Sequence, residues 1–280
     1  QGLDTFGIVL ENENFNEKEY MDQVSSLCNT RHHSIPLSKD KFLALWKETT
    51  FFFEAPMNHE GSLGLLYLNR EARKDVTVLL CGDGADEVLG GYSTSYRSFL
   101  YKHMYRRRSK ACRTAERLLY RGGQFAYRAR RSVMRRIGIR GECADSPREL
   151  DMRIRMTAMD MADVKGEKKD IELYRARRHM LSDAWNRKLL GGRFDDAPMD
   201  MDGYLGGDAL DDIIRLDLRE YLPGNGLVKT DRTTMAVSLE SRTPFLDVDL
   251  AEFCIAQPFH RKVRGSGGDK WMLRAAFEDK

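Results

Sequence analysis

Three carboxylates follow directly after an apolar stretch of this 280-residue chain, in a pattern suited to binding a metal ion and a phosphate. Val76–Leu80 has the composition of a buried strand, and a turn with two glycines comes next. Asp83 and Asp86 are spaced i and i+3, and Glu87 is adjacent. If a helix begins at Ala85, Asp83 and Asp86 can face the same way. A strand, a glycine-rich turn and a helix start are typical of the carboxyl edge of an α/β sheet, where such folds bind ligands.

The oxygen ligands of this acidic turn suit Mg²⁺, which usually binds one or two carboxylates together with substrate phosphates. The glycines would let the backbone approach such a ligand closely. The alternative is a solvated acidic turn that caps a helix, because Asp and Glu are common in first turns. The turn taken alone does not separate these two interpretations.

A second polar segment, Leu222–Met235, carries two cations at helical spacing. Lys229 and Arg232 would share one helix face at i and i+3, where they could clamp phosphate oxygens. The alternative is an ordinary surface helix whose charges form ion pairs, and the segment alone favours that alternative. An extended turn around Pro244 is expected to follow the helix.

The elements that must position these residues alternate between strand and helix at the start of the chain. The residue pattern predicts strands at Thr5–Leu10, His33–Leu37 and Val76–Leu80, with helices between them. This order favours a parallel sheet with crossover helices. From Ser93 onward every predicted element is helical, apart from a Gly- and Asp-rich loop at 191–207.

Two helix boundaries are predicted close to the second polar segment. Ile213–Tyr221 has the pattern of a short helix, and we expect Pro223 and Gly224 to end it. A last helical block is predicted to begin near Thr230.

The composition predicts a soluble protein, because mean hydropathy is −0.55 and no run of 18 apolar residues occurs. The five cysteines are widely spaced and form no CxxC pair, which indicates reduced thiols rather than a disulfide framework or a zinc site. We therefore expect a cytoplasmic protein without a membrane partner.

The charge is unevenly distributed, because residues 97–140 contain fifteen Lys or Arg and one acid. That segment has a net charge of +14 against +3 for the whole chain, so the remainder carries −11. Its arginines, interleaved with aromatic residues, could bind nucleic acid or another anionic surface. We favour instead a helical insert whose basic face is solvated or packs on the acidic remainder.

Four ordered motifs together resemble the synthetase domain of glutamine-dependent asparagine synthetases. The family's Ser-Gly-Glu/Asp-Gly-x-Asp-Glu-x-x-x-Gly-Tyr turn is matched at Cys81–Tyr92, and its Leu-Pro…Lys-x-Asp-Arg-x-x-Met segment at Leu222–Met235. Its Leu-Glu-x-Arg-x-Pro-Phe-Leu-Asp motif is matched at Leu239–Asp247, and its Lys-x-x-Leu-Arg helix at Lys270–Arg274. The resemblance spans nearly the whole chain except the basic segment and the glycine-rich loop.

The resemblance implies an α/β fold of the ATP-pyrophosphatase type, related to the adenine nucleotide alpha-hydrolases. A parallel sheet would be followed by a largely helical second half, within one synthetase domain over residues 1–280. We expect an α/β nucleotide-binding part at 1–96, a basic helical insert at 97–145 and a helical part at 146–280. The implied chemistry is adenylation of aspartate by ATP with Mg²⁺, then amidation by ammonia to asparagine, with release of AMP and pyrophosphate.

The resemblance also implies roles for the charged residues of the motifs. Asp86 would hold Mg²⁺-pyrophosphate, and Asp83 would lie beside the acyl-adenylate. Arg232 aligns with a family lysine that binds pyrophosphate; Lys229 is its near neighbour, and Lys270 is a further candidate.

The resemblance further implies that four residues would contact the nucleotide and the amino acid. Ile8, Cys81 and Gly82 would line the adenine and ribose, and Glu87 would help to bind the amino group of aspartate.

The chain departs from the family pattern in several places. The family's Ser-Gly-Gly-x-Asp-Ser loop is not found, and we expect it upstream of the strand at Thr5–Leu10. The glutaminase domain with its cysteine nucleophile is also missing, so ammonia would come from outside this chain. We expect the chain to be inactive on its own. A homodimer is expected only for a full-length form. Cys81 stands where Ser is usual, and Asp83 is one methylene shorter than Glu. A related ligase that adenylates another carboxylate, lactam-forming or peptide-cyclising, stays open as an alternative.

Overall fold

The structure is a computed structural model that describes residues 2–11, 16–54, 59–106, 109–119, 122, 174, 191, 209–264 and 269–279. The chain divides into two compact units that interleave along the sequence. The first unit comprises Gln1–Gly84 and Glu220–Asp247, and the second comprises Ala85–Arg219 and Val248–Lys280. Each unit is described by itself below.

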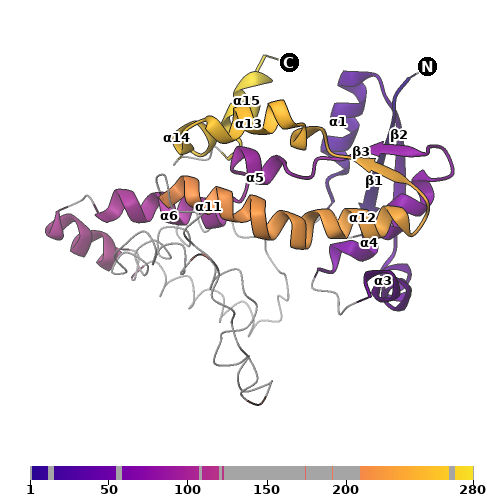
Figure 1. Ribbon diagram of the computed structural model, residues 1–280, viewed down its shortest axis with the longest axis horizontal. Helices are drawn as coiled ribbons and strands as arrows, with labels where there is room; N and C mark the ends of the chain where they lie inside the picture. Colours follow the sequence, from indigo (N-terminus) through magenta and orange to yellow (C-terminus); the bar gives the residue numbers. More distant parts are fainter. Residues whose placement is uncertain are drawn as a thin grey trace. The chain divides into compact units, whose positions relative to one another are not determined.

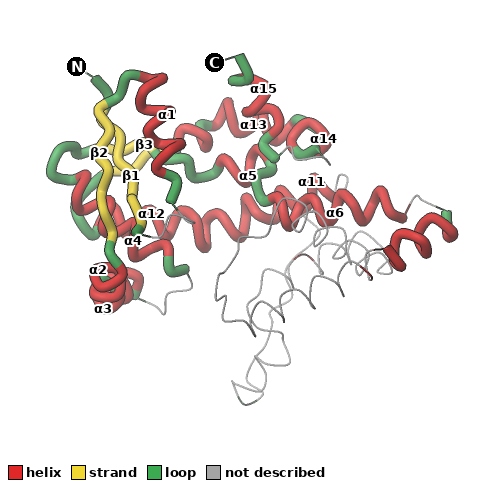
Figure 2. The backbone as a smooth tube through the Cα atoms, turned by 180° about the vertical axis from the view of Figure 1, so that it is seen from behind, coloured by secondary structure: helices red, strands yellow, loops and turns green. Residues whose placement is uncertain are grey.

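The strands of the first unit form two small parallel sheets, drawn in yellow in Figure 2. Strand β1 (Asp4–Leu10) pairs with β2 (Arg31–Leu37), with Ile8 opposite Ile35. Strand β3 (Val78–Leu80) pairs with β4 (Glu240–Arg242). The predicted strands at the start of the chain and their parallel direction are confirmed, although β3 begins two residues later than expected.

The helices of the first unit cover these strands. Helix α1 (Lys18–Cys28) connects β1 to β2, and α2 (Lys39–Ala44), α3 (Trp46–Phe53) and α4 (Gly61–Ala72) lead to β3. Helix α4 packs on β1 and β2. The core of this unit is formed by Ile35, Leu37, Leu45, Leu63 and Tyr67. The predicted alternation of strand and helix is therefore confirmed over this part of the chain.

Helix α12 (Val228–Met235) returns to this unit from late in the sequence and contacts α3, α4 and β4. It runs beside α4 in Figure 1. A buried hydrogen bond joins the two helices, from Asn69 Nδ2 to Thr233 Oγ1 at 3.1 Å. Because both side chains are buried, this bond fixes the position of α12 on the unit.

The described part of the second unit is helical. It contains α5 (Ala85–Leu89), α6 (Ser93–Arg106), α11 (Ala209–Leu216), α13 (Val248–Ala256), α14 (Phe259–Lys262) and α15 (Trp271–Ala276). Aromatic rings dominate its core, which is formed by Tyr96, Phe99, Tyr174, Ile213, Ile214, Leu216, Phe259 and Val263. The hydroxyls of Tyr96 and Tyr174 both donate to the buried Asp217. The predicted start of α5 at Ala85 is confirmed.

The predicted end of a helix at Pro223 and Gly224 is wrong. Helix α11 continues into a π-helical segment, η2 (Asp217–Leu227), that contains Pro223 and leads directly into α12. In an α-helix the proline ring clashes with the carbonyl four residues earlier and removes one hydrogen bond. The wider i→i+5 pattern of a π-helix spaces the carbonyls differently, so the helical path continues through this residue.

The expectation that all elements after Ser93 are helical is also wrong, because Glu240–Arg242 forms strand β4. Three polar residues carry no alternation of apolar side chains from which a strand could be predicted. Pairing with β3 creates the strand, and a short 3₁₀ helix, η3 (Pro244–Leu246), follows it. The chain is thus a helix-rich α/β protein with small parallel sheets.

Several predictions lie outside the described residues. They include the loop after Gly191 as far as residue 207, the boundary at 145 and half of the basic segment 97–140.

Within the ranges that the structure describes, no helix has the length and apolar character needed to cross a membrane.

The core of the first unit provides a test of the fold. Leu63 is 0% exposed on α4, whereas Leu27 on α1 is 69% exposed. We expect Leu63→Ala to lower the free energy of unfolding of this unit by about 2–5 kcal/mol, because it removes buried contacts and leaves a cavity. Leu27→Ala, the matched control, should stay within about 0.5 kcal/mol of the parent. Urea unfolding measures both, and equal effects of the two substitutions would contradict the packing described here.

Candidate active site

In the first unit, the acidic turn is built around the Asp83 carboxylate. The Cys81 thiol donates to Asp83 Oδ2 at 3.4 Å, and the Thr230 hydroxyl donates to the same oxygen. Ser241 Oγ in turn donates to Cys81 Sγ at 3.3 Å. We call Cys81, Asp83, Thr230 and Ser241 the Asp83 cluster.

Three elements position the Asp83 cluster. Cys81 and Asp83 follow β3, Ser241 lies on β4 and Thr230 lies on α12. The backbone N–H of Cys81 extends the parallel pairing by donating to Arg242 O at 3.0 Å. Because parallel strands end at the same edge of a sheet, β4 delivers Ser241 beside the residues that follow β3.

The turn itself requires glycine at one position. Gly84 has a φ of +89°, and a Cβ there would overlap the side chain of Leu246. Gly82 is exposed, with no atom within 4 Å of the place a Cβ would take. The turn is therefore closed on the Gly84 side and open at Gly82, as backbone approach by a ligand requires.

Burial affects the thiol of this cluster. It raises the pKa of Cys81, and the hydrogen bond from Ser241 opposes that shift. Cys81 is consequently a neutral hydrogen-bonding group at neutral pH, in keeping with the serine that the family pattern has at this position.

In the second unit, Asp86 forms an ion pair with Lys270, with 2.9 Å between Nζ and Oδ1. Lys270 immediately precedes α15 and has a left-handed backbone with a φ of +50°, which is uncommon for a residue other than glycine. Gly91 lies against this pair: its N–H donates to Asp86 O at 2.8 Å, and a Cβ would overlap both the Asp86 carboxylate and Lys270 Cε. Asp86 and Lys270 were both predicted as site residues, and the structure brings them into contact.

Glu87 is buried in the second unit, with 3% exposure, and accepts a hydrogen bond from the Tyr92 hydroxyl. Desolvation raises the pKa of its carboxyl, and the negative charges of Asp86 and Asp217 act in the same direction. The neutral form of Glu87 is therefore favoured more than in a solvated glutamate. Its predicted contact with an amino group stays a prediction.

The two predicted cations of α12 lie on a helix, as their spacing indicated. Arg232 is half-exposed and forms an ion pair with Glu54, with 3.1 Å between Nη1 and Oε2. Lys229 is half-buried, and no ion pair is found for it among the described residues. An ion pair of this kind agrees with the surface-helix alternative for the segment, although Glu54 was not expected as the partner. Partly exposed pairs contribute little to stability, so they open readily for another anion.

Ile8 lies on β1 and packs against α4, where a Cβ on Gly64 would come within 3.1 Å of its Cδ1. This contact makes Ile8 part of the wall of the first unit's core. Its predicted contact with adenine stays a prediction.

Thr230, Ser241 and Gly91 were missed in the sequence, although each lies within or beside a motif. Thr230 is adjacent to Lys229, but its side chain faces the unit's interior, with 7% exposure. Ser241 depends on strand β4, which was not predicted. Gly91 belongs to the Cys81–Tyr92 motif, so an argument from the tight packing of motif glycines would have found it.

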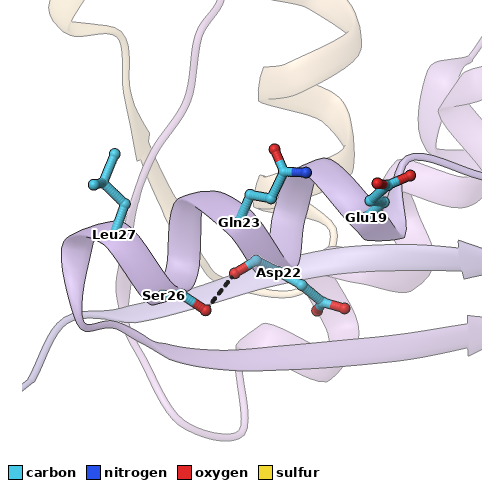
Figure 3. Close-up of a pocket in the computed structure, with 5 residues that line it drawn as sticks. All are labelled: Glu19, Asp22, Gln23, Ser26 and Leu27. Atoms are coloured by element: carbon cyan, nitrogen blue, oxygen red, sulfur yellow. Dashed lines mark hydrogen bonds between the residues drawn. The ribbon is translucent and has the colours of Figure 1, made fainter. Parts of the chain in front are cut away.

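A groove of ≈650 Å³ runs along α1 in Figure 3 and is lined by Glu19, Asp22, Gln23, Ser26 and Leu27. The Ser26 hydroxyl donates to Asp22 O within it, at 2.8 Å. The lining contains none of the residues predicted for the site. The groove therefore does not bear on the chemistry of the acidic turn.

Among the described residues, no group of three or more His, Cys, Asp or Glu side chains is arranged to hold a metal ion. Asp86 alone offers a partly exposed carboxylate within the acidic turn of the second unit. These side chains fit a metal shared with substrate phosphates and do not fit an ion held by protein ligands alone.

Comparison with known proteins places this geometry in a family. The family model described as asparagine synthase matches residues 1–280. A Mycobacterium tuberculosis protein named provisionally as a glutamine-hydrolysing asparagine synthetase is 29% identical over 99% of this chain and 38% of its own length. Asparagine synthetase [glutamine-hydrolyzing] 1 of Bacillus subtilis is 25% identical over 99% of this chain and 40% of its own length. The chain thus spans about two fifths of the length of these curated relatives. Because the family model covers its whole length, the chain belongs to the asparagine synthase family.

Proposed function

We propose that this chain carries the adenylating part of a glutamine-hydrolysing asparagine synthetase. The β-carboxylate of aspartate attacks the α-phosphorus of ATP and displaces pyrophosphate. Ammonia then attacks the carbonyl carbon of aspartyl-AMP, which yields asparagine and AMP. The observation that carries the proposal is the Asp83 cluster, in which two motifs from late in the chain meet the acidic turn: Thr230 donates to Asp83, and Ser241 donates to Cys81.

The first step requires stabilisation of the negative charge that develops on the leaving pyrophosphate. Asp86 would hold Mg²⁺ together with the phosphates, and such a metal ion supplies charge stabilisation to the displaced group. Lys270 forms an ion pair with Asp86, so the carboxylate is oriented before a ligand arrives. The left-handed backbone of Lys270 supports a functional role, because strained residues cluster at active sites.

Further cations would bind the pyrophosphate oxygens. Arg232 and Lys229 share one face of α12, and the guanidinium group suits paired contacts to phosphate. The exposed ion pair of Arg232 with Glu54 would exchange for a phosphate contact at little cost. In the second unit, Lys270 beside Asp86 is a further candidate for a phosphate contact.

The remaining predicted residues would bind the adenylate and the amino acid. Cys81, Gly82 and Ile8 would line the adenine and ribose, with the open backbone at Gly82 allowing close approach. Asp83 would lie beside the acyl-adenylate, and Glu87 would contact the amino group of aspartate. The relatives are named as glutamine-hydrolysing enzymes, which supports glutamine as the source of ammonia, released in a glutaminase domain outside this chain.

The finer fold class, an ATP-pyrophosphatase sheet, belongs to the same proposal. Strands of parallel sheets are normally covered on both faces, and they form larger sheets than pairs. The coarse parallel pairing of β1 with β2 and of β3 with β4 supports this assignment.

Exchange of labelled pyrophosphate into ATP tests the proposed reaction in the complete protein that contains this chain. We expect exchange that depends on aspartate, because adenylation is reversible before ammonia attacks. A panel of other carboxylic acids, offered singly, serves as the control for specificity. Exchange that depends on another acid and not on aspartate would favour the related ligase, and no exchange with any acid would contradict adenylation by this site.

The role of Asp86 predicts a loss of activity on removal of its charge. Asp86→Asn should lower the exchange rate by about 100-fold or more and weaken its dependence on Mg²⁺ concentration, because a neutral amide holds the ion poorly. Asp249→Asn, an exposed carboxylate of the same unit, is the matched control and should leave the rate unchanged. A wild-type response of Asp86→Asn to Mg²⁺ would remove Asp86 from the metal site.

The packing of Gly91 predicts a loss without any change of charge. Gly91→Ala places a methyl group into the Asp86–Lys270 pair, so the pair must separate or shift. We expect the exchange rate to fall by about 10- to 100-fold, because displacements of about 1 Å at an active site have effects of this size. Gly2→Ala, whose Cβ would make an ordinary 3.8 Å contact, is the control. Full activity of Gly91→Ala would show that the pair is not required.

A further inference from the structure

We propose that Thr230 is a positioning residue that fixes the orientation of the Asp83 carboxylate for its part in the reaction. The inference rests on the proposed function of Asp83 beside the acyl-adenylate. It deepens that proposal by adding a residue to which neither the motifs nor the comparisons give a role. Thr230 acts through Asp83 and does not itself contact the reacting atoms in this account.

The backbone of Thr230 is held in place by hydrogen bonds within its own helix. Its backbone oxygen accepts hydrogen bonds from the hydroxyls of Thr233, at 3.1 Å, and Thr234, at 2.8 Å. Thr233 is tied to α4 by the buried bond from Asn69. Because threonine has few side-chain conformations in a helix, an anchored Thr230 presents its hydroxyl in a defined direction.

Asp83 Oδ2 accepts hydrogen bonds from both the Thr230 hydroxyl and the Cys81 thiol. One carboxylate oxygen is thus held by donors from two segments, α12 and the end of β3. Hydrogen bonds to an ionised acceptor are about twice as strong as neutral ones. The hydrogen bond from the Thr230 hydroxyl is therefore the stronger of the two, since a thiol is a weak donor. Rotation of the Asp83 side chain would break both hydrogen bonds. Asp83 consequently has fewer conformations to lose when substrate binds.

Asp83 is the shorter of the two acids that the family motif allows at this position. Its carboxylate therefore reaches one methylene less far than that of a glutamate. Thr230 comes from α12 and meets this shorter carboxylate directly. Loss of the hydroxyl would leave Asp83 with Cys81 as its remaining donor in the Asp83 cluster.

The experiment compares Thr230→Val, which keeps the shape and removes the donor, with Thr230→Ser, which restores it. In aspartate-dependent pyrophosphate exchange, we expect Thr230→Val to lower kcat by about 10- to 100-fold with a smaller change in KM for ATP, and Thr230→Ser to recover most of the loss. Thr49→Val is the matched control, because it removes a buried hydroxyl of the same unit that donates to the Leu45 backbone oxygen, at 2.8 Å, and contacts no member of the Asp83 cluster. Equal losses in Thr230→Val and Thr49→Val would overturn the proposal.

A double-mutant cycle tests whether Thr230 acts through Asp83. In an Asp83→Asn background the carboxylate is already lost, so Thr230→Val should cause little further decrease in the exchange rate. The same fold-decrease in both backgrounds would assign Thr230 a purely structural role.

A readout without catalysis separates this inference from the proposed function. Without the Thr230 hydroxyl, the Asp83 side chain can rotate away from Cys81, which removes an acceptor and a negative charge that raise the pKa of the thiol. Alkylation of Cys81 by iodoacetamide should then be several-fold faster in Thr230→Val than in Thr230→Ser, relative to the exposed Cys28 as internal reference. An unchanged or slower rate would overturn the hold of Thr230 on Asp83. If the wild-type protein shows no exchange with any acid, the proposed function fails, and this alkylation rate still decides the inference.

Discussion

The parallel pairing of β3 with β4 is the contact on which the Asp83 cluster of the first unit depends. It brings Ser241 beside Cys81, and Cys81 lies next to the carboxylate that the whole cluster surrounds. The pairing also explains why a motif late in the chain must accompany the acidic turn. Neither segment forms the cluster without the other, because the β4 strand exists only as the partner of β3.

The second unit solves a different electrostatic problem. Its acidic turn contains Asp86 and the buried Glu87, two neighbouring carboxylates whose charges repel. The structure compensates one with an ammonium group and shields the other with a tyrosine hydroxyl. The two neighbouring acids therefore have different surroundings: Asp86 has a cation beside it, whereas burial raises the pKa of Glu87.

Much of the fold of the first unit could be predicted from the sequence, because β1 is largely apolar and β2 ends in the apolar residues Ile35, Pro36 and Leu37. Strand β4 could not, since its three polar residues become a strand only through hydrogen bonds to β3. The prediction at Pro223 failed for the opposite reason. Proline is a strong local signal for the end of a helix, but the backbone continues through it as a π-helix.

For the site, the motif residues Asp83 and Asp86 were identified from their types and spacing. Their partners Thr230 and Lys270 arrive from distant segments, and only Lys270 was proposed from the resemblance. The contact of each partner with its carboxylate is a tertiary property that no local pattern encodes.

The central claim is that this chain transfers an adenylyl group to the side-chain carboxylate of aspartate. The most direct test uses aspartate labelled with ¹⁸O in the β-carboxylate, with ATP, Mg²⁺ and ammonia, in the complete protein. Attack on the α-phosphorus followed by amidation must leave one carboxylate oxygen on the released AMP, which mass spectrometry measures. The account predicts AMP that contains one ¹⁸O atom for each asparagine formed. Asparagine formed with unlabelled AMP, or with label in inorganic phosphate, would contradict it.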